Sequence, residues 1–474
     1  MQLKGELDPG ALEVMRALRS RGFQALLAGG CVRDLLLGRC PRDWDVATDA
    51  DPAEVQRLFP GSQAVGGHFG VVLVHLGADQ YEVARFRRDG PYRDGRHPEE
   101  VSFGSAEQDA QRRDFTINGL FFDPQRGQVI DYVGGCRDLQ AGLIRAIGEA
   151  HRRFAEDHLR LLRAVRFAAR LGFAIEQGTW EAIAEAAPLL RKVSAERVRD
   201  ELTQMLTEGR ADRALQLLLE AGLLAQILPE VAAMDGVAQP PEYHPEGDVW
   251  THVRLMLGRL HAPTPTLAWG VLLHDIGKPP TYREADRIRF DGHDAVGAQL
   301  AEQICRRLRM SRAEAEQIDQ LVAQHMRIRH APQMRASKLK RLLREPFFPE
   351  LLELHRIDCL SSHGALDVYE FCQRQLQAGS TESLRPPRLL GGGDLIALGF
   401  SPGPLFGQIL AALEDEQLEG RVQDREAARR FVLARFGGWA AAADPLNSAR
   451  PSALPAPPGA HQGTSDTDPP SPPA

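Results

Sequence analysis

The sequence predicts an α+β N-terminal domain followed by domains built from helices. Within residues 1–150, FQALLAGG is typical of a strand that ends in glycines, VRDLLLG of a helix, and VVLVHLGADQYEVARF of two strands joined by a turn. From residue 151 onward, apolar residues recur at i, i+3 and i+4, as in LRLLRAVRFAARLGF, which predicts helices. The 474 residues leave room for several buried cores.

Changes in composition mark the expected domain boundaries. The proline-rich AQPPEYHPEGD separates a helical neck from a segment dotted with histidines, and RPPRLLGGGD opens a last short helical unit. After residue 440 the chain is rich in Pro, Ser and Ala, so we expect disorder because folding would bury too little apolar surface. The expected domains are residues 1–150, 151–235, 236–380 and 381–440, with a disordered end at 441–474.

The composition argues against several classes of protein. No window approaches the roughly 18 unbroken apolar residues of a membrane span, and the N-terminus lacks the apolar core of an export signal. We therefore expect a cytoplasmic protein without a membrane partner. Six cysteines without a C-x-x-C pair predict reduced, mostly buried thiols. The net charge of -7 conceals arginine clusters within residues 85–113 and 152–170, which suit a nucleic-acid partner.

Two glycines and two aspartates in LLAGGCVRDLLLGRCPRDWDVAT have a combined chemical use. Gly29 and Gly30, at the end of a strand, allow the backbone to approach a triphosphate closely. Asp43 and Asp45 are two apart, so on a strand they project to one face and can jointly hold the divalent metal of a nucleotidyl transfer. The alternative is that both acids lie on a solvent-facing strand without function.

Two further side chains extend this candidate site. Arg33 could contact the phosphates, and Glu82 in YEVARF is the candidate for a third metal-binding carboxylate. By residue type alone, Glu82 could equally be a surface glutamate of its strand.

A second segment, DAQRRDFTINGLFFD, concentrates Arg112, Arg113, Asp114 and Asn118 before an apolar run. Guanidinium groups can hold phosphate, and a carboxylate can accept hydrogen bonds from ribose hydroxyls. The same residues could instead form a salt-bridged helix end.

A third segment, AEDHLRLLRAVRFAARLGF, places Asp157 and Arg160 three residues apart and hence on one face of the expected helix. The carboxylate accepts and the guanidinium donates, so the pair can read the edge of cytosine or of adenine. An ion pair within the helix is the alternative. We expect Arg163 and Arg166 of the same segment to contribute to nucleotide binding as well.

Motif by motif, residues 22–230 resemble the class II tRNA nucleotidyltransferases, the family of CCA-adding enzymes and bacterial poly(A) polymerases. GGCVRD…RDWDVAT resembles the catalytic motif, RRDFTINGL the ribose motif, EDHLR the base-templating motif, DYVGGCRDL the hinge and ERVRDEL a supporting helix. FRRDGPYRDGRHPEEV resembles the mobile loop. Gly119 stands where alanine is usual, and Arg85 stands where threonine is common.

This resemblance implies an α+β fold: a small nucleotidyltransferase head with a mixed sheet, an all-α neck or body, an all-α HD domain and a short helical tail. It also implies that Asp43 and Asp45 bind Mg²⁺, that Arg112 and Asp114 bind nucleotide, and that Asp157 and Arg160 select the base. Gly134 and Gly135 would permit the head to rotate.

A second constellation follows in HPEGDVWTHV, LLHDIGKP, FDGHDAVGA, LVAQHMRIRH and LHRIDCL. Imidazoles and carboxylates in this order suit a site for one or two transition-metal ions that activates water. The order resembles the HD phosphohydrolase superfamily, which implies the core ligands His252, His274, Asp275 and Asp358. His293 and His325 would complete a second metal site, with Mn²⁺, Ni²⁺ or Co²⁺ as the metal. Lys278 is either a phosphate contact or a surface lysine.

The function implied is template-independent addition of CMP and AMP, from CTP and ATP, to the 3′ end of tRNA by a monomer or homodimer. Three alternatives stay open: a poly(A) polymerase, a partial enzyme that adds only CC or only A, and an HD phosphohydrolase with an inactive RNA-binding head. The segment AVGGHFGVVLVHL lacks the basic signature of poly(A) polymerases, since Gly67 and His68 stand there. For the HD site the resemblance implies phosphatase or 2′,3′-cyclic phosphodiesterase activity.

Overall fold

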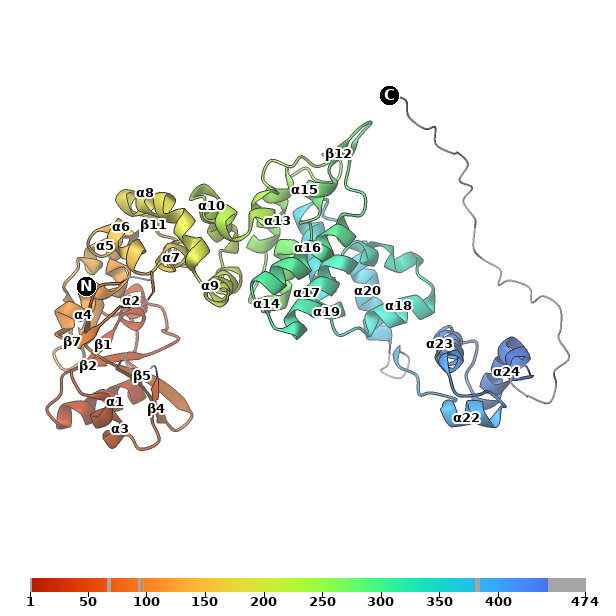
Figure 1. The fold of residues 1–474 in the computed structure, drawn as a ribbon, viewed down its shortest axis with the longest axis horizontal. Coiled ribbons are helices and arrows are strands. Elements are labelled where there is room, and N and C mark those ends of the chain that lie inside the picture. Colours follow the sequence, from red (N-terminus) through yellow and green to blue (C-terminus); the bar gives the residue numbers. More distant parts are fainter. Residues whose placement is uncertain (1, 66–69, 93–94, 97, 380–383, 442–474) are drawn as a thin grey trace, which may run out of the picture. The chain divides into compact units, whose positions relative to one another are not determined.

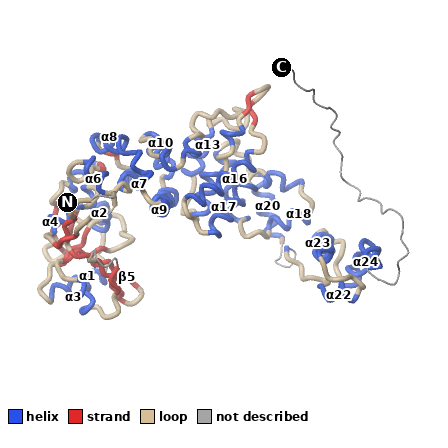
Figure 2. The backbone as a smooth tube through the Cα atoms, in the orientation of Figure 1, coloured by secondary structure: helices blue, strands red, loops and turns tan. Residues whose placement is uncertain are grey.

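The computed structural model describes residues 2–65, 70–92, 95–96, 98–379 and 384–441. Residues up to 333 together with 345–376 form one compact unit, and residues 334–344 together with the chain from 377 onward form a second. Almost all strands gather near the N-terminus, and helices make up most of the rest (Figures 1 and 2). Within the described residues, no helix is both long enough and apolar enough to cross a membrane.

A seven-stranded sheet forms the head, in the order β3-β4-β5-β2-β1-β8-β9. β2 and β5 pair in parallel, whereas the other neighbours pair antiparallel, so the expected mixed sheet is confirmed. The strands are β1 (Ala25–Ala28), β2 (Asp45–Thr48), β3 (Gln63–Val65), β4 (Val71–Leu76), β5 (Asp79–Arg85), β8 (Leu120–Asp123) and β9 (Gln128–Asp131).

Helices cover this sheet and contribute to its core. Asp8 caps α1 by accepting a hydrogen bond from the Ala11 amide, and Ser105 with Gln108 forms a capping box on α4. Leu26, Phe86 and Phe121 belong to the buried cluster between the layers. The head also contains α1 (Pro9–Ser20), α2 (Gly30–Leu37), α3 (Pro52–Leu58), α4 (Ala106–Arg112), η1 (Thr116–Asn118), α5 (Gly135–Ala141) and the ribbon of β6 (Arg87–Asp89) and β7 (Val101–Phe103).

The neck is helical except for one short strand pair, and it corrects one expectation. Asp157 is extended (φ -140°, ψ 105°) and separates α6 from α7, so Asp157 and Arg160 do not share a helix face. The Asp157 carboxylate accepts a hydrogen bond from the Leu159 amide (3.1 Å), which favours a turn over a continuous helix. The elements are α6 (Ala150–Glu156), α7 (Arg160–Leu171), β10 (Leu143–Ile144) with β11 (Ala174–Ile175), α8 (Gln177–Ala186), η2 (Ala187–Lys192), α9 (Ala195–Thr207), α10 (Ala211–Glu220), α11 (Leu224–Ile227) and α12 (Pro229–Ala232).

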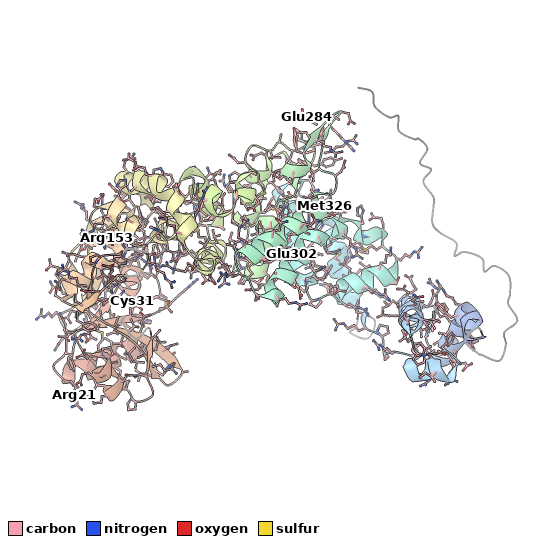
Figure 3. The ribbon with its side chains drawn as sticks, viewed as in Figure 1. Arg21, Cys31, Arg153, Glu284, Glu302 and Met326 are labelled. Atoms are coloured by element: carbon pink, nitrogen blue, oxygen red, sulfur yellow. The ribbon has the colours of Figure 1, made fainter. Side chains whose placement is uncertain are left out.

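A helical bundle follows around α14 (Pro265–Leu273), whose apolar side chains are buried on all sides. One hairpin, β12 (Arg283–Glu284) with β13 (Ile288–Arg289), departs from the expected all-α domain, and Figure 3 shows Glu284 at its outer end. The other helices are α13 (Val249–Gly258), α15 (Lys278–Thr281), α16 (His293–Arg307), α17 (Arg312–Gln324), η3 (Arg327–Gln333), α19 (Phe348–Ser361) and α20 (Asp367–Ala378).

The second unit has a core of its own around Leu395, Phe400 and Ile409. Residues 334–344 fold with this unit, although the sequence analysis assigned them to 236–380: Lys340 Nζ donates to the Leu418 carbonyl at 2.7 Å. Its helices are α18 (Ala336–Leu343), α22 (Gly392–Ala397), α23 (Pro404–Leu418) and α24 (Arg425–Ala441). The segment expected to be disordered, 441–474, lies outside the described residues apart from Ala441.

Gly134 and Gly135, the glycines of the expected hinge, differ in backbone angle and in the space around them. Gly134 has a left-handed backbone (φ +78°) with open space around its Cα, whereas a Cβ on Gly135 would lie 2.2 Å from the Thr116 carbonyl oxygen. We predict that Gly135→Ala lowers the free energy of unfolding by roughly 1–3 kcal/mol, because a backbone atom must move. Gly134→Ala is the control and should cost about 1 kcal/mol from its backbone angle alone. Calorimetric melting of both variants checks this, and equal costs would contradict the contact.

Candidate active site and candidate metal centre

Three carboxylates meet at one edge of the head sheet. Asp45 begins β2 and lies in register with Glu82 on β5, while Asp43 lies just before β2. All three line one cavity of about 800 Å³. Burial and the neighbouring charge of Glu82 raise the pKa of Asp45 to about 6, and burial also raises the pKa of Glu82. Clustered oxygen ligands that resist ionising next to one another suit Mg²⁺, whose charge would offset their repulsion.

The glycine turn before α2 lies against the same cavity. Gly29 has φ +72°, and a Cβ there would lie 2.6 Å from Arg113 Nη1, so only glycine fits. Arg33 is buried on α2 and donates from Nη1 to Asn118 Oδ1 at 2.7 Å. The residues expected from the sequence to contact phosphate therefore lie together, and Gly30 lines the cavity as well.

Asp114 is held from several sides. Its Oδ1 accepts hydrogen bonds from the Phe115 amide (2.8 Å) and Asn118 Nδ2 (3.0 Å), and its Oδ2 accepts from Arg163 Nε (2.8 Å). Although burial opposes ionisation, the charge of Arg163 and these hydrogen bonds lower the pKa of Asp114 to about 2. A permanently ionised, rigid carboxylate can accept hydrogen bonds from sugar hydroxyls.

Arg112 and Arg113 form ion pairs and also line the cavity, so each of the two interpretations of the sequence describes part of their surroundings. Each forms an ion pair with the buried Asp109, at 2.7 Å and 2.9 Å, as the salt-bridged alternative predicted. Both also line the cavity, so their remaining N–H groups are in position for phosphate.

Asp157 and Arg160 line this cavity but do not pair with each other. Arg197 Nη2 donates to both Asp157 oxygens, at 3.1 and 3.0 Å, and Arg160 pairs with Glu156 at 3.0 Å. The alternative interpretation, an ion pair within one helix, is therefore wrong. Arg197, on α9, is a site residue that we did not single out, since 40 residues separate it from its partner.

Arg166 was expected to contribute to nucleotide binding, but it is not among the residues that line the cavity. It is buried, and its Nε donates to Glu201 Oε2 at 2.7 Å. Glu201 also lies 3.7 Å from Arg163 Nη1, so Arg166 acts on the site only through neighbours. Tyr92, Asp89 and Arg96 also line the cavity; they belong to the segment that resembles the mobile loop, but the sequence did not single them out as site residues.

The HD constellation assembles from five helical segments in the bundle. Asp275 Oδ1 lies 3.6 Å from His293 Nε2 and 3.8 Å from His325 Nε2, and its Oδ2 lies 3.2 Å from His274 Nε2. His252 Nε2 lies 3.2 Å from Asp358 Oδ1. Asp275 belongs to two groups of potential ligands, one with His252 and His274 and one with His293 and His325.

The orientation of the imidazoles fits a metal. Backbone carbonyls accept from Nδ1 of His274 (2.9 Å), His293 (2.9 Å) and His325 (2.6 Å), so their Nε2 lone pairs point inward. His293 Nε2 and His325 Nε2 lie only 3.2 Å apart, and His252 Nε2 is buried without a hydrogen-bond partner among the described residues. Burial and the neighbouring His274 lower the pKa of His325 to about 3, which keeps that ring neutral as a ligand must be.

Lys278 is not the surface lysine that the sequence allowed. It is buried, and Nζ lies 2.7 Å from Asp275 Oδ2 and donates to Gln239 Oε1 at 2.6 Å. The adjoining cavity of about 610 Å³ is lined by four basic side chains, Lys278, Arg287, Arg289 and Arg329, and by four acidic ones, Glu242, Asp275, Asp291 and Asp358.

Comparisons with known protein families match three parts of this chain. Residues 25–145 match the poly A polymerase head domain, residues 172–234 the probable RNA and SrmB- binding site of polymerase A, and residues 249–362 the HD domain.

Similar proteins carry the names of two activities. A CCA-adding enzyme of Geobacillus kaustophilus is 47% identical over 225 residues, and a poly(A) polymerase I of Haemophilus influenzae is 39% identical over 241 residues. These matches cover 47% and 48% of this chain and 55% and 53% of the relatives, so the chain spans about half the length of the relatives it matches.

Among solved structures, the Bacillus stearothermophilus CCA-adding enzyme in complex with CTP is similar in fold. The TM-score is 0.70 at 27% identity, over 91% of this chain and 99% of that chain. A CCA-adding enzyme in complex with ATP, at 21% identity, shares the fold with a TM-score of 0.61 over 90% and 96% of the two chains.

The carboxylate edge, the helical neck and the histidine bundle thus correspond to a poly A polymerase head domain, an RNA-binding segment and an HD domain. The resemblance to the class II tRNA nucleotidyltransferases is confirmed by these matches and by the similarity to CCA-adding enzymes and a poly(A) polymerase.

The raised pKa of Asp45 predicts that its ionised carboxylate lowers the stability of the metal-free protein. We expect Asp45→Asn to stabilise the metal-free protein at pH 8 by roughly 1–3 kcal/mol, because a buried charge next to Glu82 is removed. The gain should shrink as the pH falls below about 6, where the wild-type carboxyl is protonated in the folded state. Melting in EDTA across this pH range measures it, and a destabilised variant at pH 8 would refute the electrostatic explanation.

Proposed function

We propose that this protein adds CMP and AMP, from CTP and ATP, to the 3′ end of tRNA without a nucleic-acid template. The observation that carries the proposal is a shared cavity: Asp157 and Arg160, which can read a base, line the same space as the three metal-binding carboxylates. The similarity to proteins named CCA-adding enzymes, one of them solved with CTP, supports this choice. Its substrates put this reaction in the cytoplasm.

The residues divide the work of one nucleotidyl transfer. Asp43, Asp45 and Glu82 would hold Mg²⁺, whose positive charge would favour ionisation of the attacking hydroxyl and offset the charge of the leaving pyrophosphate. The 3′ oxygen of the RNA attacks the α-phosphorus, and the bond from that phosphorus to the bridging oxygen breaks. Arg33, Arg112 and Arg113, with the Gly29–Gly30 backbone, contact the triphosphate.

The remaining residues choose and hold the nucleoside. Asp114, kept ionised by Arg163, accepts hydrogen bonds from the ribose hydroxyls. Asp157 accepts from the exocyclic amine of cytosine or adenine, while Arg160 donates to the adjacent ring nitrogen. Arg197 orients Asp157, so a small movement of α9 would move the carboxylate between the two base geometries.

A poly(A) polymerase is the second candidate, because a relative of that name is 39% identical over 241 residues. The two functions share the head chemistry and differ in when addition stops. The segment with Gly67 and His68, from which the sequence analysis argued against poly(A) polymerase, lies outside the described residues.

Extension of a tRNA transcript that lacks its 3′ CCA tests the proposal. With Mg²⁺, CTP and ATP we predict addition that stops after CCA, and no addition with UTP or GTP. Asp45→Ala should reduce the rate by roughly 100-fold or more, because several kcal/mol of transition-state stabilisation are lost. Long adenosine tails would assign a poly(A) polymerase, and a stop at CC or a need for a CC end would assign a partial enzyme.

We further propose that the HD site is a metal-dependent phosphohydrolase for phosphomonoesters or 2′,3′-cyclic phosphates. Its imidazole-rich ligand set suits Mn²⁺, Ni²⁺ or Co²⁺, which would supply an activated water. Among the side chains that line the cavity, Lys278, Arg287 and Arg329 can hold the phosphate.

Separate variants distinguish the two activities. We predict that His274→Ala lowers hydrolysis of 2′,3′-cyclic AMP and p-nitrophenyl phosphate in Mn²⁺ or Ni²⁺ by roughly 100-fold or more but leaves tRNA extension intact. Asp45→Ala should do the reverse. Hydrolysis without any extension in the wild-type protein would favour a hydrolase whose head only binds RNA.

A further inference from the structure

Two ionisable side chains beside the HD centre, His244 and Glu246, lie before the segment that matches the HD domain, residues 249–362. Glu246 Oε1 accepts hydrogen bonds from His252 Nδ1 at 2.6 Å and from His244 Nδ1 at 2.9 Å. The Glu246 side chain is only 7% exposed, although it lies in the loop before α13. A carboxylate so far removed from water is retained where its partners need it.

The four histidines of the centre are not held alike. In His274, His293 and His325, Nδ1 donates to a backbone carbonyl, that of Val271, Phe290 and Val322 respectively. In His252 alone of the four, Nδ1 faces a carboxylate. An ionised acceptor binds the Nδ1 proton more strongly than an amide carbonyl does and makes the other ring nitrogen a stronger metal ligand.

We propose that Glu246 is a positioning residue of the HD metal centre: it holds His252 in the tautomer that presents Nε2, beside Asp358, to the metal. The inference rests on the metal site proposed above. His252 Nε2 is buried and lies 3.2 Å from Asp358 Oδ1, so an ion between the two would be held by both groups and would take the place of a proton. Because the Nδ1 side is occupied by Glu246, the ring cannot reverse its roles without breaking a short hydrogen bond.

The cluster of His244, Glu246 and His252 does not fit an ion of its own. Ligand atoms about 2.0–2.2 Å from a tetrahedral metal lie roughly 3.3–3.5 Å apart. Glu246 Oε1 lies closer than that to both Nδ1 atoms, at 2.6 and 2.9 Å, which are hydrogen-bond lengths. His244 therefore shares the acceptor of His252, and its ring packs edge-on against His252 with centroids 4.9 Å apart.

Mn²⁺ binding, counted by the electron paramagnetic resonance of the free ion, tests this role. The full chain with Asp45→Asn serves as the parent, because one metal-binding carboxylate of the head is then absent. We expect Glu246→Gln to weaken Mn²⁺ binding by about 10- to 100-fold with the stoichiometry unchanged. Glu246→Asp, which keeps an acceptor charge, should fall between the parent and Glu246→Gln.

Two controls isolate the hydrogen bond to His252. Glu302→Gln removes the same charge from an exposed residue of α16 that does not line the cavity and should shift the dissociation constant by less than about threefold. His244→Ala leaves the bond from His252 to Glu246 in place and should have an equally small effect. A second Glu246→Gln variant that keeps the native Asp45 should still extend tRNA, which would show that the chain folds.

Three results would overturn the proposal, each in its own way. Parent-like affinity in Glu246→Gln would mean that the carboxylate does not support the ligand. Loss of one Mn²⁺ equivalent in both Glu246→Gln and His244→Ala would mean that the cluster itself binds an ion. If the parent binds no Mn²⁺ that His274→Ala removes, the proposed metal centre falls, and this inference falls with it.

Discussion

A closed ring of buried ion pairs and hydrogen bonds joins the head to the neck, and the head cavity depends on it. Asp114 binds Arg163, and Glu201 lies between Arg163 and Arg166. Glu208 lies near Arg166 and Arg170, and Arg170 in turn lies near Asp34. Asp34 pairs with Arg33, which returns through Asn118 to Asp114.

This ring contains four carboxylates and four guanidinium groups, so its charges balance. Removing one member would leave a buried partner without its counter-charge, which is far more costly than the net worth of the intact pair. The ring joins the head, with Asp43, Asp45 and Glu82, to the neck, with Asp157 and Arg160, and all five residues line one cavity. One cavity thereby receives its chemistry from two domains.

The two candidate metal centres differ in the charge of the groups that they offer to an ion. In the head, Asp45 and Glu82 are neighbours in a parallel strand register, and their mutual repulsion, added to burial, is what a hard cation can offset. In the HD centre the ligands are mainly neutral imidazoles, each turned by an acceptor on its Nδ1 side. The first centre depends on charge and the second on tautomer.

Local sequence was sufficient wherever one segment carried the whole signal. The strand–glycine–helix turn at Gly29 and the two strands within residues 71–85 were predicted correctly. The histidines of the HD constellation also lie around Asp275, as the sequence led us to expect. The errors lie where a side chain chooses a distant partner. Helical periodicity placed Asp157 inside one helix, but its own hydrogen bond to Leu159 breaks the helix, and Arg197 takes the carboxylate.

Arg166 is a second residue whose partner could not be predicted from the local sequence. Its position in an arginine-rich helix suggested nucleotide contact, yet a turn of the helix directs it to Glu201 in the interior. By contrast, His244 and Glu246 carried no recognisable spacing relative to the other histidines. Only the packing of the loop before α13 brings them to His252.

The sequence of head, neck and HD segments and the resemblance to known enzymes could be predicted from the amino-acid sequence, because they depend on residue type and on spacing within single segments. The tertiary structure alone decided which arginine serves which carboxylate, which imidazole nitrogen faces inward and which charges lie buried. Those choices depend on distances between segments up to about a hundred residues apart, and chain folding sets such distances without leaving a local pattern in the sequence.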